Sequence, residues 1–225
     1  GADYSGNNLH RNIIFNNSNV LMEPISFYEA PTRKKLWSLL DETCHENCDY
    51  VVIPHNSNLS NGYMFEKPDQ DELLIQSIRE PLVEIFQHKG SSECNINPND
   101  PLCNFEQLPY KDFRSKFQKD LSSSPDSSFV REALGNGLQF QEELSINPLK
   151  FGLIASTDTH LGTPGAVDED SFQGHGGAGK SFRSSIPDGL PDDIEFNPGG
   201  LAVAWAEENS RSSIFGAFKR KDVYG

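Results

Sequence analysis

The sequence is poor in basic residues and contains no long hydrophobic run. None of its apolar stretches approaches the roughly 20 residues that a membrane-spanning helix requires, so no membrane partner is expected. Nineteen Lys and Arg residues stand against 33 Asp and Glu residues, which leaves a formal charge of −14. Because this charge repels a phosphate backbone, nucleic acid is not an expected partner either.

The first residues, GADYSGNNLHRN, contain neither an initiator methionine nor the charged and apolar regions of a signal peptide. We expect that processing or truncation has removed the true start. The four cysteines form two pairs, Cys44/Cys48 and Cys94/Cys103, and neither has the C-x-x-C spacing of zinc knuckles or thioredoxin sites. Cys94 and Cys103 flank a loop rich in Asn, Pro and Asp, which a disulfide would close in an exported protein. The alternative is four ordinary thiols.

Short apolar runs alternate with helical patterns along the chain. The runs predict buried strands at 12–15, 49–55, 82–88, 151–157 and 201–207. The helical patterns cover 33–44, 69–79, 127–144 and 210–221. This alternation predicts an α/β fold of βα units, with parallel strands whose carboxyl ends share one rim. We expect a single domain, 1–225, with long loop insertions at 89–126 and 162–200 that act as lids.

Three of the predicted strands end in residues that can bind a metal ion. His55 closes the second, Glu84 and His88 lie on the third, and Asp158 and His160 close the fourth. Residues two apart on a strand point to the same side, so Asp158 and His160 are predicted to converge. In parallel α/β folds, chemistry gathers at the carboxyl ends of strands, which predicts a metal site built from these five residues. A single histidine at such a position is more often a structural hydrogen-bonding group.

One motif match is misleading. GHGGAGKS, residues 174–181, satisfies the phosphate-binding pattern G-x-x-x-x-G-K-[ST]. That motif requires a buried strand before it and a helix after it, whereas here an acidic stretch precedes it and two prolines follow. We therefore interpret it as a glycine-rich lid that carries His175 and Lys180 over the metal site. No G-x-S-x-G nucleophile motif is present in the sequence.

Several long motifs resemble the bacterial domain-of-unknown-function 3604 family over nearly the whole chain. They are NLHRNIIF, VVIPHNSNLSNGYMF, REPLVEIFQHKGSSEC, FGLIASTDTHLGTPG and NPGGLAVAWAEENSRSSIFGAFKRKDVYG. That family is in turn similar to the PHP-type and amidohydrolase-like metal-dependent hydrolases. The resemblance implies a distorted (β/α) barrel that binds two or three divalent ions. It also implies hydrolysis of a small molecule, with a phosphate ester favoured, by metal-activated water.

The resemblance also assigns residues. Asp158 and His160 match the D-x-H that closes the hydrolase site and are the expected catalytic pair, His55 matches a middle-strand ligand, and Glu84 and His88 lie on the next ligand-bearing strand. Because imidazoles outnumber carboxylates in this set, zinc or manganese is expected rather than magnesium. The alternative is a catalytically inactive barrel that acts as a binding or structural domain.

The resemblance departs from the hydrolases at the front, because no H-x-H is present in the 225 residues. We therefore expect a fragment: an incomplete barrel, inactive alone, whose natural partner is the missing N-terminal half. The family resemblance includes Cys94 and Cys103, so we expect their Cα atoms within the disulfide range of about 4.4–6.8 Å. A periplasmic or exported location is accordingly favoured over a cytoplasmic one.

Overall fold

The strands form three small sheets in the computed structural model, which describes residues 7–95, 99–104, 125–160, 162, 165 and 200–225. In the first sheet, β1 (Arg11–Phe15) pairs antiparallel with β2 (Tyr50–Pro54). In the second, β3 (Leu82–Gln87) lies between β4 (Gly90–Ser91), antiparallel, and β5 (Gly152–Ala155), parallel. In the third, β6 (Val203–Ala204) pairs antiparallel with β7 (Val223–Tyr224).

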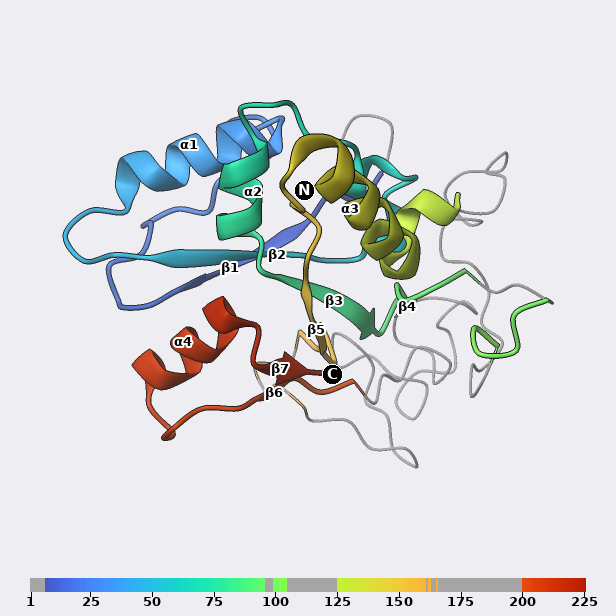
Figure 1. Cartoon of the computed structure of the whole chain (residues 1–225). Coiled ribbons are helices and arrows are strands. Elements are labelled where there is room, and N and C mark those ends of the chain that lie inside the picture. The colour runs from blue at the N-terminus through green and yellow to red at the C-terminus, as the bar shows by residue number, and fades with distance from the viewer. Residues whose placement is uncertain (1–6, 96–98, 105–124, 161, 163–164, 166–199) are drawn as a thin grey trace, which may run out of the picture.

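The prediction that all five strands lie parallel is right for β3 and β5 and wrong for β1, which is antiparallel to β2. β6 pairs antiparallel with β7, a strand that the sequence did not predict. In a simple βα unit the helix alone carries the chain back to the start of the sheet. Here the irregular segment 16–32 returns the chain first, and α1 (Arg33–Thr43) then makes a second pass before β2 begins (Figure 1). The two passes together leave β2 antiparallel to β1. The distorted, incomplete (β/α) barrel itself stays a prediction.

The four predicted helices are all present; the first begins at the predicted residue and the other three begin one to four residues later. They are α1, α2 (Leu73–Arg79), α3 (Val130–Leu144) and α4 (Arg211–Arg220). Thr32 and Ser210 cap α1 and α4 by accepting hydrogen bonds from backbone N–H groups of the first turn. The described part of the chain also includes three short 3-10 turns: η1 (Ser57–Leu59), η2 (Tyr63–Phe65) and η4 (Asp126–Ser128). Within the described residues, no helix is both long and apolar enough to cross a bilayer.

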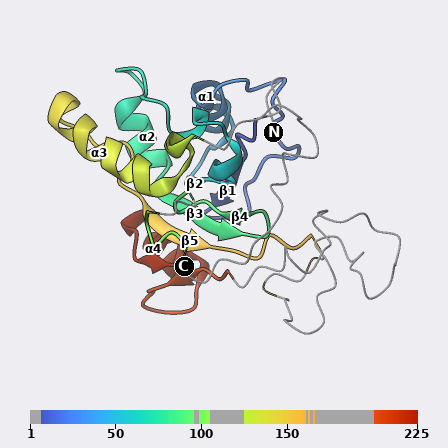
Figure 2. The same cartoon turned by 90° about the vertical axis from the view of Figure 1, so that its right-hand side faces the viewer.

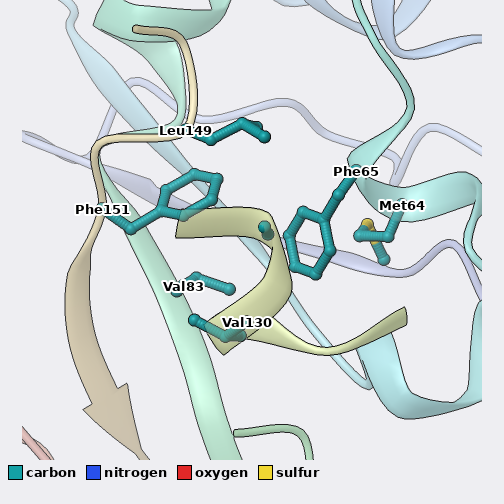
Figure 3. Close-up of a cluster of buried hydrophobic side chains, with 7 residues drawn as sticks. Met64, Phe65, Val83, Val130, Leu149 and Phe151 are labelled. Atoms are coloured by element: carbon teal, nitrogen blue, oxygen red, sulfur yellow. The ribbon is translucent and has the colours of Figure 1, made fainter. Parts of the chain in front are cut away.

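The helices cover two sides of the strands. Figures 1 and 2 show α1, α2 and α3 on one side and α4 with the β6–β7 pair on the other. Every residue of β2 is buried, as expected for a strand in the middle of this arrangement. Among the described residues, the largest apolar cluster joins α3 and η2 to β3 and to the segment before β5 (Figure 3): Met64, Phe65, Val83, Val130, Ala133, Leu149 and Phe151. This cluster anchors β3 and β5, whose ends carry the polar residues discussed below.

Two disulfides close short loops. Cys94 and Cys103 are bonded with a Cα–Cα distance of 5.8 Å, which confirms the predicted spacing. Cys44 and Cys48 are also bonded, at 5.2 Å, and link the end of α1 to the turn before β2. The sequence had left this second bond open. All four cysteines of the chain are therefore oxidised.

Both predicted loop insertions lie partly outside the described residues. Of 89–126, the structure describes β4, the segment carrying both disulfide cysteines, and η4. Most of 162–200, including the glycine-rich stretch 174–181 with His175 and Lys180, lies outside the described residues. The lid role of these segments stays a prediction.

Candidate functional site

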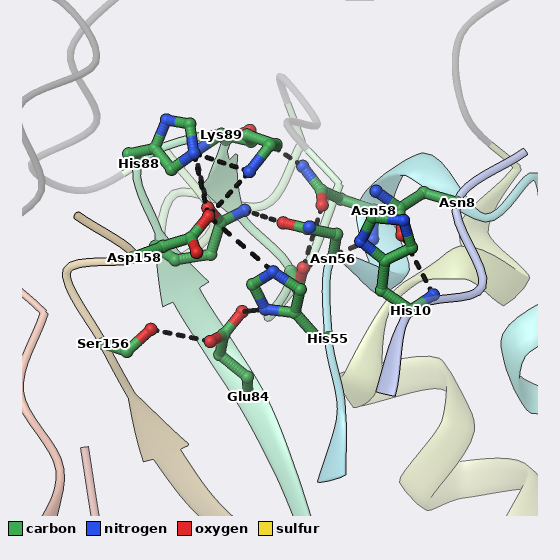
Figure 4. A network of polar contacts seen from close by, with 12 residues as sticks. Asn8, His10, His55, Asn56, Asn58, Glu84, His88, Lys89, Ser156 and Asp158 are labelled. Atoms are coloured by element: carbon green, nitrogen blue, oxygen red, sulfur yellow. Dashed lines mark hydrogen bonds and ion pairs between the residues drawn. The ribbon is translucent and has the colours of Figure 1, made fainter. Parts of the chain in front are cut away.

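Polar side chains meet where β2, β3 and β5 end (Figure 4). His55 follows β2 directly, His88 and Lys89 form the turn between β3 and β4, and Asp158 lies three residues beyond β5. Asp158 is thus in a loop and not on the strand, with a backbone φ of 48° in the left-handed region. The predicted meeting of strand ends is seen. The strand alternation invoked for Asp158 and His160 is not its cause, because β5 ends at Ala155.

Asp158 is the centre of the cluster. Its Oδ2 lies 2.6 Å from Nζ of Lys89 and 2.8 Å from Nε2 of His88. Nε2 of His55 is 3.7 Å from the same oxygen, and Nε2 of His160 is 3.4 Å from Oδ1. The structure therefore brings four basic side chains around one carboxylate. His160 is the most peripheral of them, with a side chain that is 64% exposed.

Glu84 lies behind His55 and does not face the centre. It is 2% exposed, and its Oε1 accepts a hydrogen bond from Nδ1 of His55 at 2.7 Å. Its Oε2 accepts from the Ser156 hydroxyl, also at 2.7 Å. With Nδ1 of His55 donating to Glu84, Nε2 is left as an acceptor that faces Asp158. This arrangement favours Glu84 as the residue that orients His55, while direct coordination by Glu84 stays a prediction.

His10 joins the same cluster although the sequence did not point to it. Its ring stacks on His55 with centroids 6.1 Å apart and planes inclined by 15°. The cause is the antiparallel pairing of β1 and β2: Arg11 lies opposite Pro54, and the amide of His55 donates to the carbonyl of His10. Burial lowers the pKa of His10 to about 4, and the nearby charge of Lys89 acts in the same direction. His10 is therefore neutral at pH 7.

Buried amides hold the turn that presents His88 and Lys89. The backbone N–H of Lys89 donates to Oε1 of Gln87, and the carbonyl of Lys89 accepts from Nδ2 of Asn58 at 3.1 Å. Gln87 in turn donates to Oδ1 of Asn56, and Ser92 donates to Oδ1 of Asn58. These amides are buried, so the backbone on both sides of Lys89 is fixed. The sequence signal was present in PHNSN and FQHKGSS, but only the fold shows that the two stretches meet.

The electrostatics of the centre follow from burial and from Lys89. Burial opposes ionisation of Asp158, but the hydrogen bond with His88 and the charge of Lys89 outweigh it and hold the pKa of this carboxyl well below its usual range. Burial of His88 lowers the pKa of its imidazole, and the Lys89 charge adds to this against the opposing effect of Asp158. Asp158 is therefore ionised and His88 neutral at pH 7.

The shortest contacts of the centre form a triangle. Nζ of Lys89 is 2.5 Å from Nε2 of His88 and 2.6 Å from Oδ2 of Asp158, and these two atoms are 2.8 Å from each other. Nε2 of His88 has one hydrogen-bonding position, so it either donates to Asp158 or accepts from Lys89. If the neutral ring of His88 accepts from Lys89, then Nε2 of His88 and Oδ2 of Asp158 are two acceptors that share the Lys89 ammonium group.

Across the described residues, no group of three or more His, Cys, Asp or Glu side chains is arranged as it stands to hold a metal ion. The ammonium group of Lys89 lies among the donor atoms that would have to surround such an ion. The two donor spacings lie on either side of the separation expected between metal ligands. Oδ2 of Asp158 lies 2.8 and 3.7 Å from the two histidine nitrogens, and tetrahedral ligands with bonds of 2.0–2.1 Å lie roughly 3.3 Å apart.

The comparisons with known proteins point to one family. A family model described as "Protein of unknown function (DUF3604)" matches residues 1–225. No curated protein and no solved structure matches the chain. The chain therefore belongs to the DUF3604 family.

Proposed function

We propose that this chain carries the site of a metal-dependent hydrolase. The observation that supports it is the convergence of His55, His88 and Asp158 at the ends of three strands, with donor spacings of 2.8 and 3.7 Å around one carboxylate oxygen. Two imidazoles and one carboxylate form a donor set that suits zinc or manganese better than magnesium. A bound divalent ion would supply an activated water near neutral pH.

The residues around these donors have separate tasks in the proposal. Glu84 fixes the tautomer and orientation of His55, as carboxylates behind metal-bound histidines do. Asp158 contributes the charged donor of the set. His160, which is exposed and 3.4 Å from Asp158, exchanges a proton with solvent or with the leaving group.

A phosphate ester is the substrate class we propose. The chain has a formal charge of −14, yet His55, His88, Lys89 and His160 gather around a single carboxylate, Asp158, with the neutral ring of His10 beside them. Lys89 supplies a cation and the imidazole rings supply hydrogen-bonding groups, and an anionic ligand could use both. The expected similarity of the DUF3604 family to PHP-type hydrolases favours the same choice.

One observation favours the second candidate, a binding or structural domain without catalysis. The ammonium of Lys89 neutralises Asp158 directly, and a buried ion pair of this kind is complete without an ion. In that case the cluster would serve only to hold the turn after β3 against the loop after β5.

Metal content and activity separate the two candidates. We expect the full-length protein to retain at least one divalent ion per chain by elemental analysis and to hydrolyse p-nitrophenyl phosphate or its diester. Asp158→Asn should abolish both, whereas the exposed Asp69→Asn should change neither. Less than one ion per chain in the wild type, with no hydrolysis, would favour the structural candidate.

The disulfides support the proposal of an exported or periplasmic protein. Both pairs, including the four-residue separation of Cys44 and Cys48, are bonded, and such bonds persist in oxidising compartments. Mass spectrometry of protein isolated from its native cells, after alkylation of free thiols, tests this: four alkylated cysteines would contradict it.

A further inference from the structure

Lys89 is the residue of the site whose position is least expected for a lysine. Its side chain is only 15% exposed, and its charge lies against Asp158 in the middle of the cluster. Lysine is seldom buried to this extent unless it is paired. The site therefore contains a cation that comes from the chain itself.

The backbone around Lys89 is built to keep it there. Gln87 accepts from its N–H at 2.9 Å and Asn58 donates to its carbonyl, so neither end of the residue can shift without breaking a buried hydrogen bond. The next residue, Gly90, has a φ of 101°, a conformation that favours glycine and sets the direction of the turn. Because the backbone is already fixed, only the side-chain rotamers of Lys89 remain to be ordered when its ammonium group pairs with Asp158.

The ammonium group of Lys89 contacts two of the three proposed metal donors. Nζ lies 2.6 Å from a carboxylate oxygen and 2.5 Å from an imidazole nitrogen, and Nε2 of His55 faces the same oxygen from 3.7 Å. A divalent ion shared by these donors would need the space that Nζ now occupies. Two cations cannot share that space, so the ammonium and the ion exclude each other.

From this geometry we propose that Lys89 is a built-in substitute for the metal ion: its ammonium group neutralises Asp158 in the ion-free protein and must leave when a divalent ion binds. The inference rests on the proposed metal site. Lys89 is a competing group and not a ligand, so it weakens metal affinity while stabilising the ion-free protein. No covalent bond is made or broken in this exchange. The Lys89 ammonium group keeps its proton and moves into solvent, and the protein with its bound ion carries the two additional positive charges of that ion.

Lys89→Met tests the competition, because methionine keeps much of the length and removes the charge. We expect Lys89→Met to bind Zn²⁺ or Mn²⁺ about tenfold to a hundredfold more tightly than the wild type in calorimetric titration, the range that a hydrogen bond to a charged group supplies. Lys89→Arg, which keeps the charge, should not show this gain. Lys67→Met is the matched control, since Lys67 is half-exposed and pairs with Glu143 far along the chain.

The outcomes are distinct. If Lys89→Met binds the ion no more tightly than the wild type, the proposal that Lys89 takes the place of the ion is wrong, and the proposed metal site is unaffected. Failure of wild type and Lys89→Met alike to bind either ion would overturn the metal site and, with it, this inference. Tight binding by Lys89→Met alone would support both.

A second measurement uses the wild-type protein and does not depend on how the variants fold. An amine-acylating reagent followed by peptide mass spectrometry measures the reactivity of individual lysines. Addition of Zn²⁺ or Mn²⁺ should increase labelling of Lys89 several-fold and leave Lys67 unchanged. If labelling of Lys89 stays constant while calorimetry shows that the ion binds, the ammonium group does not leave and the proposal is wrong.

Discussion

Replacement of Glu84 by glutamine is the sharpest test of how the site is oriented. The change keeps the shape of a side chain that is 2% exposed and removes its charge. Glu84 accepts two hydrogen bonds of 2.7 Å, from His55 and Ser156, and glutamine can accept only one of them while its NH₂ group faces the other donor. Loss of one charge-assisted hydrogen bond predicts a decrease in unfolding free energy of about 1.5–3 kcal/mol.

The effect of Glu84→Gln on metal binding follows from the same hydrogen bond between Glu84 and His55. Without a carboxylate to hold Nδ1–H, His55 loses the preference that directs Nε2 toward Asp158. Loss of such an orienting group lowers metal affinity by about 10- to 100-fold, and we expect Glu84→Gln to fall in this range by calorimetric titration with Zn²⁺. The number of ions bound per chain should not change, because Glu84 is not a ligand in this scheme.

Two controls and an NMR measurement complete the test. Ser156→Ala removes the other hydrogen bond but keeps the charge and the His55 contact, so its affinity should stay close to that of the wild type. Glu93→Gln removes a charge on the exposed surface, where it pairs with Arg131. Imidazole ¹⁵N shifts should show Nδ1–H at His55 in the wild type and a mixture of tautomers in Glu84→Gln. Unchanged affinity in a folded Glu84→Gln would refute the orienting role, and loss of one ion per chain would make Glu84 a ligand.

Three further predictions concern stability. Burial, with a hydrogen bond to Asp41, raises the pKa of Tyr50, so this phenol stays neutral in the folded protein above pH ~10 while it ionises in the unfolded chain. The free energy of unfolding should therefore fall as pH rises through that range. Urea unfolding between pH 8 and 11 should show a smaller fall in Tyr50→Phe than in the exposed control Tyr63→Phe. Leu149→Ala should lower the free energy of unfolding by about 2–5 kcal/mol because Leu149 is fully buried, and an effect no larger than that of the 69% exposed Leu138→Ala would contradict the core assignment. Reduction of the two disulfides, whose cysteines lie 4 and 9 residues apart, should cost about 2–3 kcal/mol each, seen as a lower Tm with phosphine reductant; no change in Tm would contradict this.

The sequence predicted the elements well because their signals are local. The apolar runs before His55, around Glu84 and before Ser156 are strands, and α1 and α4 begin at the capping residues Thr32 and Ser210. Strand direction is not a local property. The apolar run at 12–15 is compatible with either strand direction. Because the irregular segment 16–32 returns the chain before α1, β1 pairs antiparallel with β2.

The same error explains which site residues were missed. With β1 taken as parallel, its start belongs to the opposite edge of the sheet, and His10 has no reason to be near His55. Lys89 was missed because a lysine in a polar turn is ordinarily a solvated residue. Its pairing with Asp158 depends on contact between two segments 69 residues apart, which no spacing within either segment reveals.

The wide spacing of the site along the chain has a consequence for folding kinetics. His55 and Glu84 are 29 residues apart, Glu84 and Ser156 are 72 apart, and His10 must also arrive from the first strand. Each of these contacts closes a long loop of the chain. Such contacts form late in folding because the entropy of loop closure is lost before the contact itself stabilises the protein. An ion or substrate held by this cluster would bridge segments that separate when the chain opens. Its occupancy should therefore slow unfolding far more than it speeds folding, and the lifetime of the native state would report directly on whether the site is filled.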